Sequence, residues 1–211
     1  MIIRKQFTVT SAHIVRNCYS ERCKFSLHAH TGIIEVFLQG STEEGAPTHV
    51  DRAGMLMDFG ITKKVFKPLV DLFQDTVVMW NLDNDTYKNY VKKTTDNWVE
   101  IPFTPSAELL SAFYQLHFDS ILRRVQFAND EDPGLNVLKT RYHETRTGWA
   151  EADINDANSL VIDEGWLLTL VSAEFGPVVQ ERYDALDEQI GGLYSEDPII
   201  LEEPVQQVAR P

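Results

Sequence analysis

The stretch Cys23-Lys-Phe-Ser-Leu-His-Ala-His30 leads directly into the apolar run Thr31-Gly-Ile-Ile-Glu-Val-Phe-Leu38. The second run is rich in β-branched and aromatic residues, which predicts a strand from His28 to Leu38. Side chains two positions apart leave the same face of a strand, so His28 and His30 are expected to point at one spot. Alternating histidines also occur on solvated strand faces, so the pair alone does not define a site.

A third histidine ends another predicted strand. The run Phe7-Thr-Val-Thr-Ser-Ala-His13 alternates apolar and polar side chains, as a half-buried strand does. Three histidines with an open fourth position are typical of catalytic zinc sites. Convergence of His13, His28 and His30 would make such a site, and Cys23 in the connecting loop would lie where a metal favours its thiolate. The alternative for His13 is a partly buried histidine satisfied by its neighbours.

The composition limits the class of protein. The chain has 211 residues, of which 43% are hydrophobic and 24% charged, and its net charge is -13. This length suits one core with additions. The negative charge argues against nucleic-acid binding, and we find neither a membrane-span pattern nor a signal peptide. We therefore expect a cytoplasmic protein without nucleic-acid or membrane partners, in which Cys18 and Cys23 are free thiols rather than a small disulfide.

The hydrophobic pattern predicts the order strand, strand, helix, helix, strand, strand over the first 155 residues. Asp58 is expected to cap a helix whose apolar residues run from Ile61 to Phe73, with a kink or break at Pro68. Thr104 is expected to cap the second helix, with Pro105 at the first helical position. The final two strands are predicted to start near residues 136 and 149.

The remaining segments give weaker patterns. Residues 75–84 are predicted to be irregular, and residues 85–97 to form a polar excursion. Further on, residues 166–171 fit either a strand or a helix, while residues 177–190 are predicted to be helical. Residues 194–211 are acidic and flanked by proline, which predicts a mobile tail.

Five motifs follow one another along the first 155 residues. They are Phe7-x-x-x-Ser-Ala-His13, Cys23 before Leu27-His28-Ala-His30, Gly54-Met-Leu-Met-Asp58-Phe59, Thr104-Pro-Ser-Ala-Glu108 and His143-Glu144-Thr145. In this order they resemble the 6-pyruvoyl-tetrahydropterin synthases and the related 6-carboxy-tetrahydropterin synthases of the queuosine and 7-deazaguanine pathway. An ordered set of five motifs is far more specific than any one of them.

The resemblance implies an α+β tunnel fold, in which a four-stranded antiparallel sheet carries two helices on one face. A pterin-synthase-like domain would cover residues 1–155, followed by an acidic C-terminal extension over residues 156–211. Members of this family assemble their sheets into a trimeric barrel and stack two barrels, with active sites between subunits. A homo-oligomer, either a trimer or a hexamer, is therefore implied.

The resemblance also implies roles for individual residues. The implied Zn²⁺ ligands are His13, His28 and His30. Cys23 would be the catalytic base, and Glu144 would anchor a small-molecule pterin by accepting paired N–H groups from its aminopyrimidine edge. Glu108 would belong to the substrate-binding residues. Asp75 would be the remaining catalytic member of an Asp-His pair.

Two departures from the family pattern affect these roles. The family's His-Gly-His has Ala29 in place of glycine, which an extended backbone tolerates. The family's Asp-His pair follows the first helix, where this chain has Gln74-Asp75 or Asp75-Thr76, depending on the register, and neither contains histidine. His143 is a possible substitute, but adjacent strand residues face opposite sides of a sheet, so it is not expected to share a pocket with Glu144.

The sequence thus predicts a zinc-dependent synthase that converts 7,8-dihydroneopterin triphosphate to 6-carboxy-tetrahydropterin, with loss of acetaldehyde and triphosphate. The segments at residues 103–108 and 144–145 favour the carboxy over the pyruvoyl product. The missing histidine and the acidic extension leave open a non-catalytic relative that binds zinc and pterin or serves as a scaffold. A different lyase or hydrolase acting on a related pterin or purine is a third hypothesis.

Overall fold

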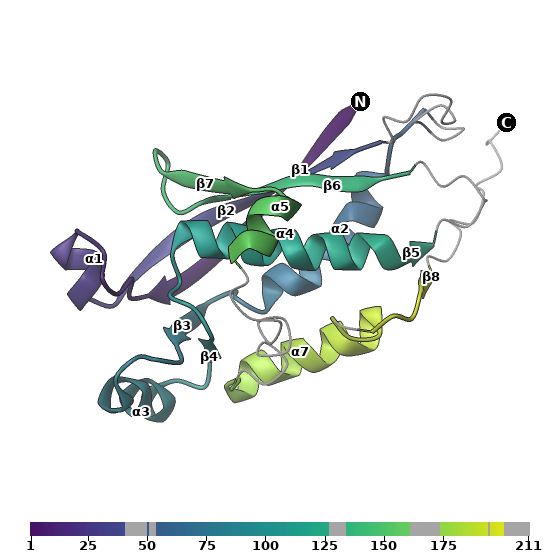
Figure 1. Cartoon of the computed structure of the whole chain (residues 1–211). Coiled ribbons are helices and arrows are strands. Elements are labelled where there is room, and N and C mark those ends of the chain that lie inside the picture. The colour runs from purple at the N-terminus through teal and green to yellow at the C-terminus, as the bar shows by residue number, and fades with distance from the viewer. Residues whose placement is uncertain (41–49, 51–53, 127–133, 161–173, 194, 201–211) are drawn as a thin grey trace, which may run out of the picture.

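A computed structural model describes residues 1–40, 50, 54–126, 134–160, 174–193 and 195–200 of the 211-residue chain (Figure 1). Six strands in these residues form one sheet. In chain order they are β1 (Ile2–His13), β2 (His28–Gln39), β3 (Thr76–Trp80), β4 (Trp98–Ile101), β6 (Asn136–His143) and β7 (Trp149–Ala152). Their order across the sheet is β4-β3-β1-β2-β6-β7.

The predicted four-stranded antiparallel sheet is present within this larger sheet. β1, β2, β6 and β7 pair antiparallel in succession. β3 and β4 extend the sheet beyond β1 and pair in parallel, so the prediction of four strands is wrong by two. The run Val77-Val-Met-Trp80 is short and continuously apolar, without the alternation that identifies a strand. Its pairing with the distant strand β1 decides its structure.

Residues 85–97, predicted as a polar excursion, contain helix α3 (Asp85–Thr94). Asn84 caps this helix, since its side chain accepts a hydrogen bond from the amide of Thr86 at 2.8 Å. Val91 is the buried residue of α3. Tyr87 packs against the buried cluster that contains Val91, but this apolar stripe is short and lies within a mainly polar segment, so composition alone does not indicate the helix.

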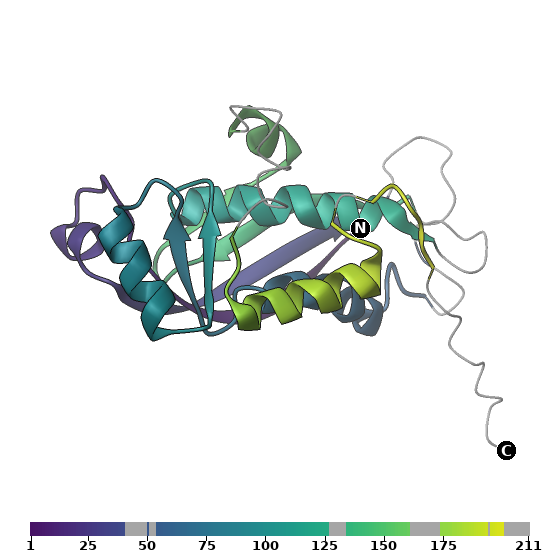
Figure 2. The ribbon, with the colours of Figure 1, turned by 90° about the horizontal axis from the view of Figure 1, so that it is seen from below.

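Helices α2 (Phe59–Asp71) and α4 (Ala107–Arg124) cover one face of the sheet, as Figure 2 shows from below. The prediction that Asp58 caps α2 is confirmed, because its carboxylate accepts a hydrogen bond from the Gly60 amide at 2.5 Å. The helix continues through Pro68 without a break.

Helix α4 begins two residues later than predicted. Its N-cap is Ser106, whose hydroxyl accepts a hydrogen bond from the Leu109 amide at 3.4 Å. The prediction that Thr104 caps the helix and Pro105 opens it is therefore wrong, because the side chain that reaches a free amide of the first turn is Ser106. Among the helices described, none combines the length and the apolar character needed to cross a membrane.

The hydrophobic core lies between the sheet and the helices. The rings of Phe66 in α2 and Phe118 in α4, both fully buried, lie 4.7 Å apart at its centre. Helix α7 (Pro177–Ile190), which was predicted as helical, buries Val179 and Leu186 in the same core. Because burial of apolar surface is the main stabilising contribution, α7 is bound to the sheet and helices by a shared core.

The start of the predicted mobile tail is structured. β8 (Ile199–Ile200) pairs in parallel with β5 (Val125–Gln126), which follows α4. The prediction is therefore wrong for residues 195–200, because Ile199 is buried in the core. Residues 194 and 201–211, like the ambiguous residues 166–171, lie outside the described residues. Two further helices are short: α1 (Glu21–Phe25), within a predicted loop, and α5 (Ile154–Leu160).

Candidate metal centre

The pairing of β1 with β2 brings three histidines to one face at the end of the two strands. His13 lies directly opposite His28, and Ser11 lies opposite His30. Side chains of directly opposed residues in an antiparallel pair share a face. Since His28 and His30 are two positions apart, all three rings lie on the side that carries the core. Ala29 lies within this extended strand, opposite Ala12, so no glycine is needed between the histidines.

The three imidazole rings form a compact cluster. One ring nitrogen from each of His13, His28 and His30 lies within 4.8 Å of the others. The ring centroids are 4.9 to 5.4 Å apart. His13 is 1% exposed, and the other two rings are partly buried. This spacing suits three nitrogen ligands of one metal ion.

The hydrogen bonding of the rings supports this interpretation. The buried Nε2 atoms of all three histidines lack a hydrogen-bond partner among the described residues. His28 Nδ1 lies 2.9 Å from the carbonyl oxygen of Ser26; a carbonyl only accepts, so this nitrogen carries the proton and Nε2 presents its lone pair. Buried nitrogen atoms without partners are unfavourable. A metal ion bound by the three lone pairs would satisfy them, so the residues fit such an ion.

Glu144 adds a carboxylate to the cluster. Its Oε1 atom lies 3.4 Å from Nε2 of His13. The nearby His13 ring lowers the pKa of Glu144, burial opposes this, and the charges of His30 and His28 add to the lowering. Burial in turn lowers the pKa of His30, against the opposing effect of Glu144. The two shifts favour an ionised Glu144 carboxylate and a neutral His30 ring, and a neutral ring is the form in which histidine binds a metal.

Cys23 lies in α1, in the connection between β1 and β2, and is partly exposed. Its carbonyl oxygen accepts a hydrogen bond from the Val15 amide at 3.1 Å. Arg16 links the same connection to the loop after β3. Its guanidinium donates to the carboxylate of Asp83 at 2.6 Å and to the carbonyl of Lys24 at 3.2 Å. The partner Asp83 lies 67 positions away from Arg16 in the sequence, so no local pattern indicates this contact.

Asp75 and Glu108 are exposed residues on other elements than the three histidines. Asp75 is exposed in the turn before β3, with its amide hydrogen-bonded to the Thr10 carbonyl at 2.6 Å. Glu108 is exposed in the first turn of α4. In the described part of the chain, neither residue, nor Cys23, makes a hydrogen bond or ion pair with the three histidines or Glu144. The chain thus brings together four of the seven predicted site residues, the three histidines and Glu144.

Residues 2–155 match the family model of 6-pyruvoyl tetrahydropterin synthase. The chain belongs to the 6-pyruvoyl tetrahydropterin synthase family. Proteins from two strains of Helicobacter pylori, both named 6-carboxy-5,6,7,8-tetrahydropterin synthase, are each 28% identical to it over 156 residues, which cover 74% of this chain and 74% of each relative. The antiparallel sheet with α2 and α4 on one face is the tunnel fold of this family.

A solved structure shows the same fold. The crystal structure of an uncharacterized protein from Wolinella succinogenes is similar to this chain with a TM-score of 0.52 and 19% sequence identity. The similarity covers 73% of this chain and 98% of that protein. At this identity it supports the fold alone.

His143, considered as a substitute for the missing histidine, turns away from the family's site. Its Nε2 atom lies 2.9 Å from Glu35 Oε2. It is paired with Ile33 in the sheet, whereas Tyr142, one residue earlier, faces the core. Adjacent strand residues face opposite sides, so His143 lies on the face without helices.

Proposed function

We propose that this member of the 6-pyruvoyl tetrahydropterin synthase family is a zinc-dependent 6-carboxy-tetrahydropterin synthase. It would convert 7,8-dihydroneopterin triphosphate to 6-carboxy-tetrahydropterin, releasing acetaldehyde and triphosphate, as a step toward 7-deazaguanine compounds. The observation that carries this proposal is the cluster of three histidine rings, whose buried Nε2 atoms make no hydrogen bond among the described residues, with the Glu144 carboxylate 3.4 Å from one of them. The names of the two Helicobacter pylori relatives support the carboxy product.

The residues of the cluster divide into two roles. His13, His28 and His30 would hold Zn²⁺ through one ring nitrogen each. A bound zinc ion supplies a Lewis acid that acidifies the carbon next to a coordinated hydroxyl group. Glu144 would accept two N–H groups from the aminopyrimidine edge of the pterin, which fixes the ring relative to the histidines. Its lowered pKa keeps it an acceptor at neutral pH.

Cys23, Asp75 and Glu108 would act around this core. The Cys23 thiolate would take a proton from the substrate side chain, in a connection whose position Arg16 fixes. Asp75 would transfer a proton at the face of the substrate opposite Cys23, and Glu108 would bind the substrate. Because these residues make no hydrogen bond or ion pair with the histidines within the described part of one chain, we propose that a homo-oligomer, a trimer or hexamer, completes each site from two subunits.

Incubation of zinc-loaded protein with 7,8-dihydroneopterin triphosphate tests the proposal, with products followed by liquid chromatography and mass spectrometry. We expect 6-carboxy-tetrahydropterin and acetaldehyde, strongly reduced formation in Cys23→Ala, and retained formation in Cys18→Ala, the matched thiol control. Zinc content should fall in His28→Ala. Intact substrate in the presence of bound zinc, or full zinc content in His28→Ala, would contradict the proposal.

A second function is favoured by one observation. The position of the family's catalytic histidine is taken by Asp75 or Thr76, and the Thr76 hydroxyl is buried and hydrogen-bonded. A non-catalytic relative that binds zinc and pterin would show this loss. Calorimetric titration with the substrate distinguishes the two, since binding without any product supports the non-catalytic protein.

A further inference from the structure

The turn between α2 and β3 has an unusual backbone. It consists of Gln74, Asp75 and Thr76, the residues that stand where the family has its Asp-His pair. Asp75 has φ 55°, in the left-handed region that residues with a side chain rarely adopt. Such a conformation persists only where neighbouring groups hold it. The groups that hold this turn therefore determine where Asp75 presents its carboxylate.

Strand β1 holds the turn from one side. The Asp75 amide donates to the Thr10 carbonyl at 2.6 Å. The Thr10 amide in turn donates to the side-chain oxygen of Gln74 at 3.2 Å. Both contacts extend the sheet pairing of β3 with β1 by one residue. They fix the turn to the strand that also carries His13.

Arg182 holds the turn from the other side. One nitrogen of its guanidinium donates to the Gln74 carbonyl and, at 3.1 Å, to the Thr76 hydroxyl. Arg182 therefore bonds to the residues on both sides of Asp75. It lies 108 positions from Gln74 in the sequence, and it lies outside the segment that matches the family model.

Helix α7 fixes the position of Arg182. Val179 and Leu186, three residues before and four residues after it, lie on the same side of the helix and are buried in the core. The start of α7 is tied to β4 by backbone hydrogen bonds, among them one from the Gly176 amide to the Trp98 carbonyl at 2.9 Å. A Cβ at Gly176 would lie 2.4 Å from the Asp96 carbonyl oxygen, so the helix meets the strand in close contact.

Asn97 completes the support. Its side-chain nitrogen donates to the Asp75 carbonyl, and its side-chain oxygen accepts from the Thr76 hydroxyl at 3.1 Å. Asn97 precedes β4, the strand against which α7 begins. Asn97, next to β4, and Arg182, in α7, thus both donate hydrogen bonds to the three-residue turn.

We propose that Arg182 is a positioning residue for Asp75, and that α7 is a part of the active-site architecture. Arg182 acts through the Gln74 carbonyl and the Thr76 hydroxyl, which hold the left-handed backbone between them. The inference rests on the proposed function, because it takes Asp75 as a group that moves a proton. It also gives a role to a helix that lies beyond the family match.

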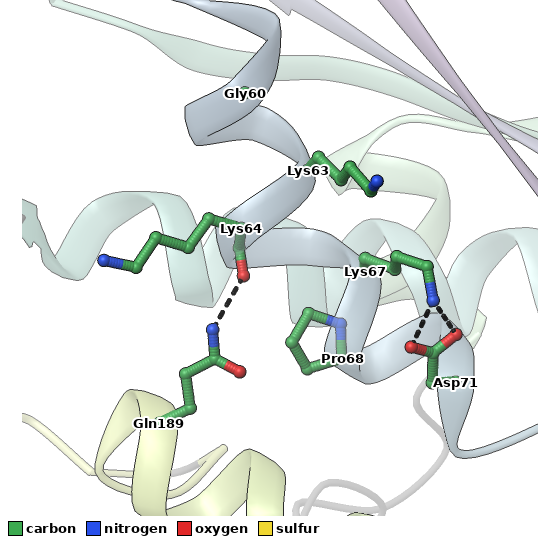
Figure 3. Close-up of a pocket in the computed structure, with 7 residues that line it drawn as sticks. All are labelled: Gly60, Lys63, Lys64, Lys67, Pro68, Asp71 and Gln189. Atoms are coloured by element: carbon green, nitrogen blue, oxygen red, sulfur yellow. Dashed lines mark hydrogen bonds and ion pairs between the residues drawn. The ribbon is translucent and has the colours of Figure 1, made fainter.

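Two substitutions of Arg182 and one control on the same helix test the proposal. Arg182→Ala removes both hydrogen bonds to the turn, and Arg182→Lys keeps the charge but can keep only part of the bonding. The control is Gln189→Ala. It removes a hydrogen bond of 3.2 Å from α7 to the Lys64 carbonyl of α2, at the pocket in Figure 3, and leaves the turn untouched.

Kinetics with 7,8-dihydroneopterin triphosphate should separate positioning from folding. We expect Arg182→Ala to lower kcat about tenfold or more, because a displacement on the order of 1 Å can cost roughly a hundredfold. KM and zinc content should stay close to the wild-type values, since the histidines and Glu144 are untouched. The kcat of Arg182→Lys should lie between the values of Arg182→Ala and the wild type, and the kcat of Gln189→Ala should equal that of the wild type. An unchanged kcat in Arg182→Ala, or an equal loss in Gln189→Ala, would overturn the proposal.

Hydrogen–deuterium exchange provides a measurement that does not depend on activity. The segment 73–80 should exchange faster in Arg182→Ala than in the wild type or Gln189→Ala, because the Asp75 amide loses its fixed geometry. If the wild type shows no pterin turnover but this difference is present, the proposed function fails and the support by Arg182 stands. Unchanged exchange in segment 73–80 overturns the proposal whatever the activity.

Discussion

Replacing Glu35 by glutamine should destabilise the protein measurably, because this carboxylate is buried within a set of charged partners. Its side chain is 2% exposed on β2. It accepts hydrogen bonds from Arg4 at 2.7 Å and Gln6 at 2.7 Å, from Arg141 at 3.4 Å, and it contacts His143 at 2.9 Å. Glu35→Gln keeps the shape of the side chain but removes its charge. The new NH₂ group is itself a donor, and it would face the N–H donors that the carboxylate now accepts from.

The size of the effect follows from the exposure of the partners. Removal of one member of a fully buried ion pair costs about 3–5 kcal/mol. Here the side chains of Arg4 and Arg141 are 50% and 23% exposed, so water solvates them after the substitution. A hydrogen bond to a charged group contributes about 1.5–3 kcal/mol. We therefore expect Glu35→Gln to lower the free energy of unfolding by about 2 kcal/mol at pH 7.

The effect should depend on pH in a defined direction. Burial raises the pKa of Glu35, but the hydrogen bonds from His143 and Gln6 and the charge of Arg4 outweigh it, so the net pKa lies below 4.5. A lowered pKa in the folded state stabilises the protein fully above the pKa of the unfolded state. This contribution is lost as pH falls through the lowered value. The difference between wild type and Glu35→Gln should therefore shrink below pH 4.5.

Urea unfolding followed by circular dichroism measures this difference, at one fixed protein concentration because the proposed assembly would be coupled to unfolding. Glu151→Gln is the matched control, since Glu151 pairs with Arg141 at 2.7 Å but is 34% exposed. A partly exposed pair contributes about 0.5 kcal/mol. A loss in Glu35→Gln as small as that in the control, or a difference that persists unchanged at low pH, would refute the reasoning.

Two further substitutions test the packing of α7 and the start of α2. Gly176→Ala should lower the melting temperature in a thermal scan, because its Cβ would lie 2.4 Å from the Asp96 carbonyl oxygen and relief of such overlap costs about 1–3 kcal/mol; an unchanged melting temperature would contradict this close contact. Asp58→Ala should lower the free energy of unfolding in urea by about 1 kcal/mol through loss of the N-cap, and Asp58→Asn, which can still cap, should lose less. Equal losses would exclude capping as the cause.

Elements with a local signature could be predicted from the sequence. The strand after His28 was found because its alternation and β-branched residues are local properties, and the start of α2 was found because Asp58 needs only the next two residues to cap it. The same approach failed for β3 and α3. The five residues of β3 lack alternation, and the ten residues of α3 are mainly polar, with Val91 as the single buried side chain, so neither segment stands out in the hydrophobic pattern.

The candidate site divides in the same way. The His-x-His spacing on one strand predicts two convergent rings, since the period of a strand is fixed by its geometry. The contact of Glu144 with His13, by contrast, joins the residue after β6 to the end of β1, and β2 separates these two strands in the sheet. The resemblance to the family predicted both residues as members of the site. The distance of 3.4 Å between Glu144 Oε1 and His13 Nε2 follows only from the folded sheet.

By itself the sequence determined the family, the central antiparallel strands and the prediction that three histidines converge. Each of these depends on residues close together in the chain or on motifs in a fixed order. Only the tertiary structure decided that β3 and β4 widen the sheet, that Glu144 approaches His13, and that Arg182 is hydrogen-bonded to the turn containing Asp75. The physical reason is that these contacts join residues far apart in sequence. Such contacts depend on how sheet and helices bury a common core, and no local pattern records them.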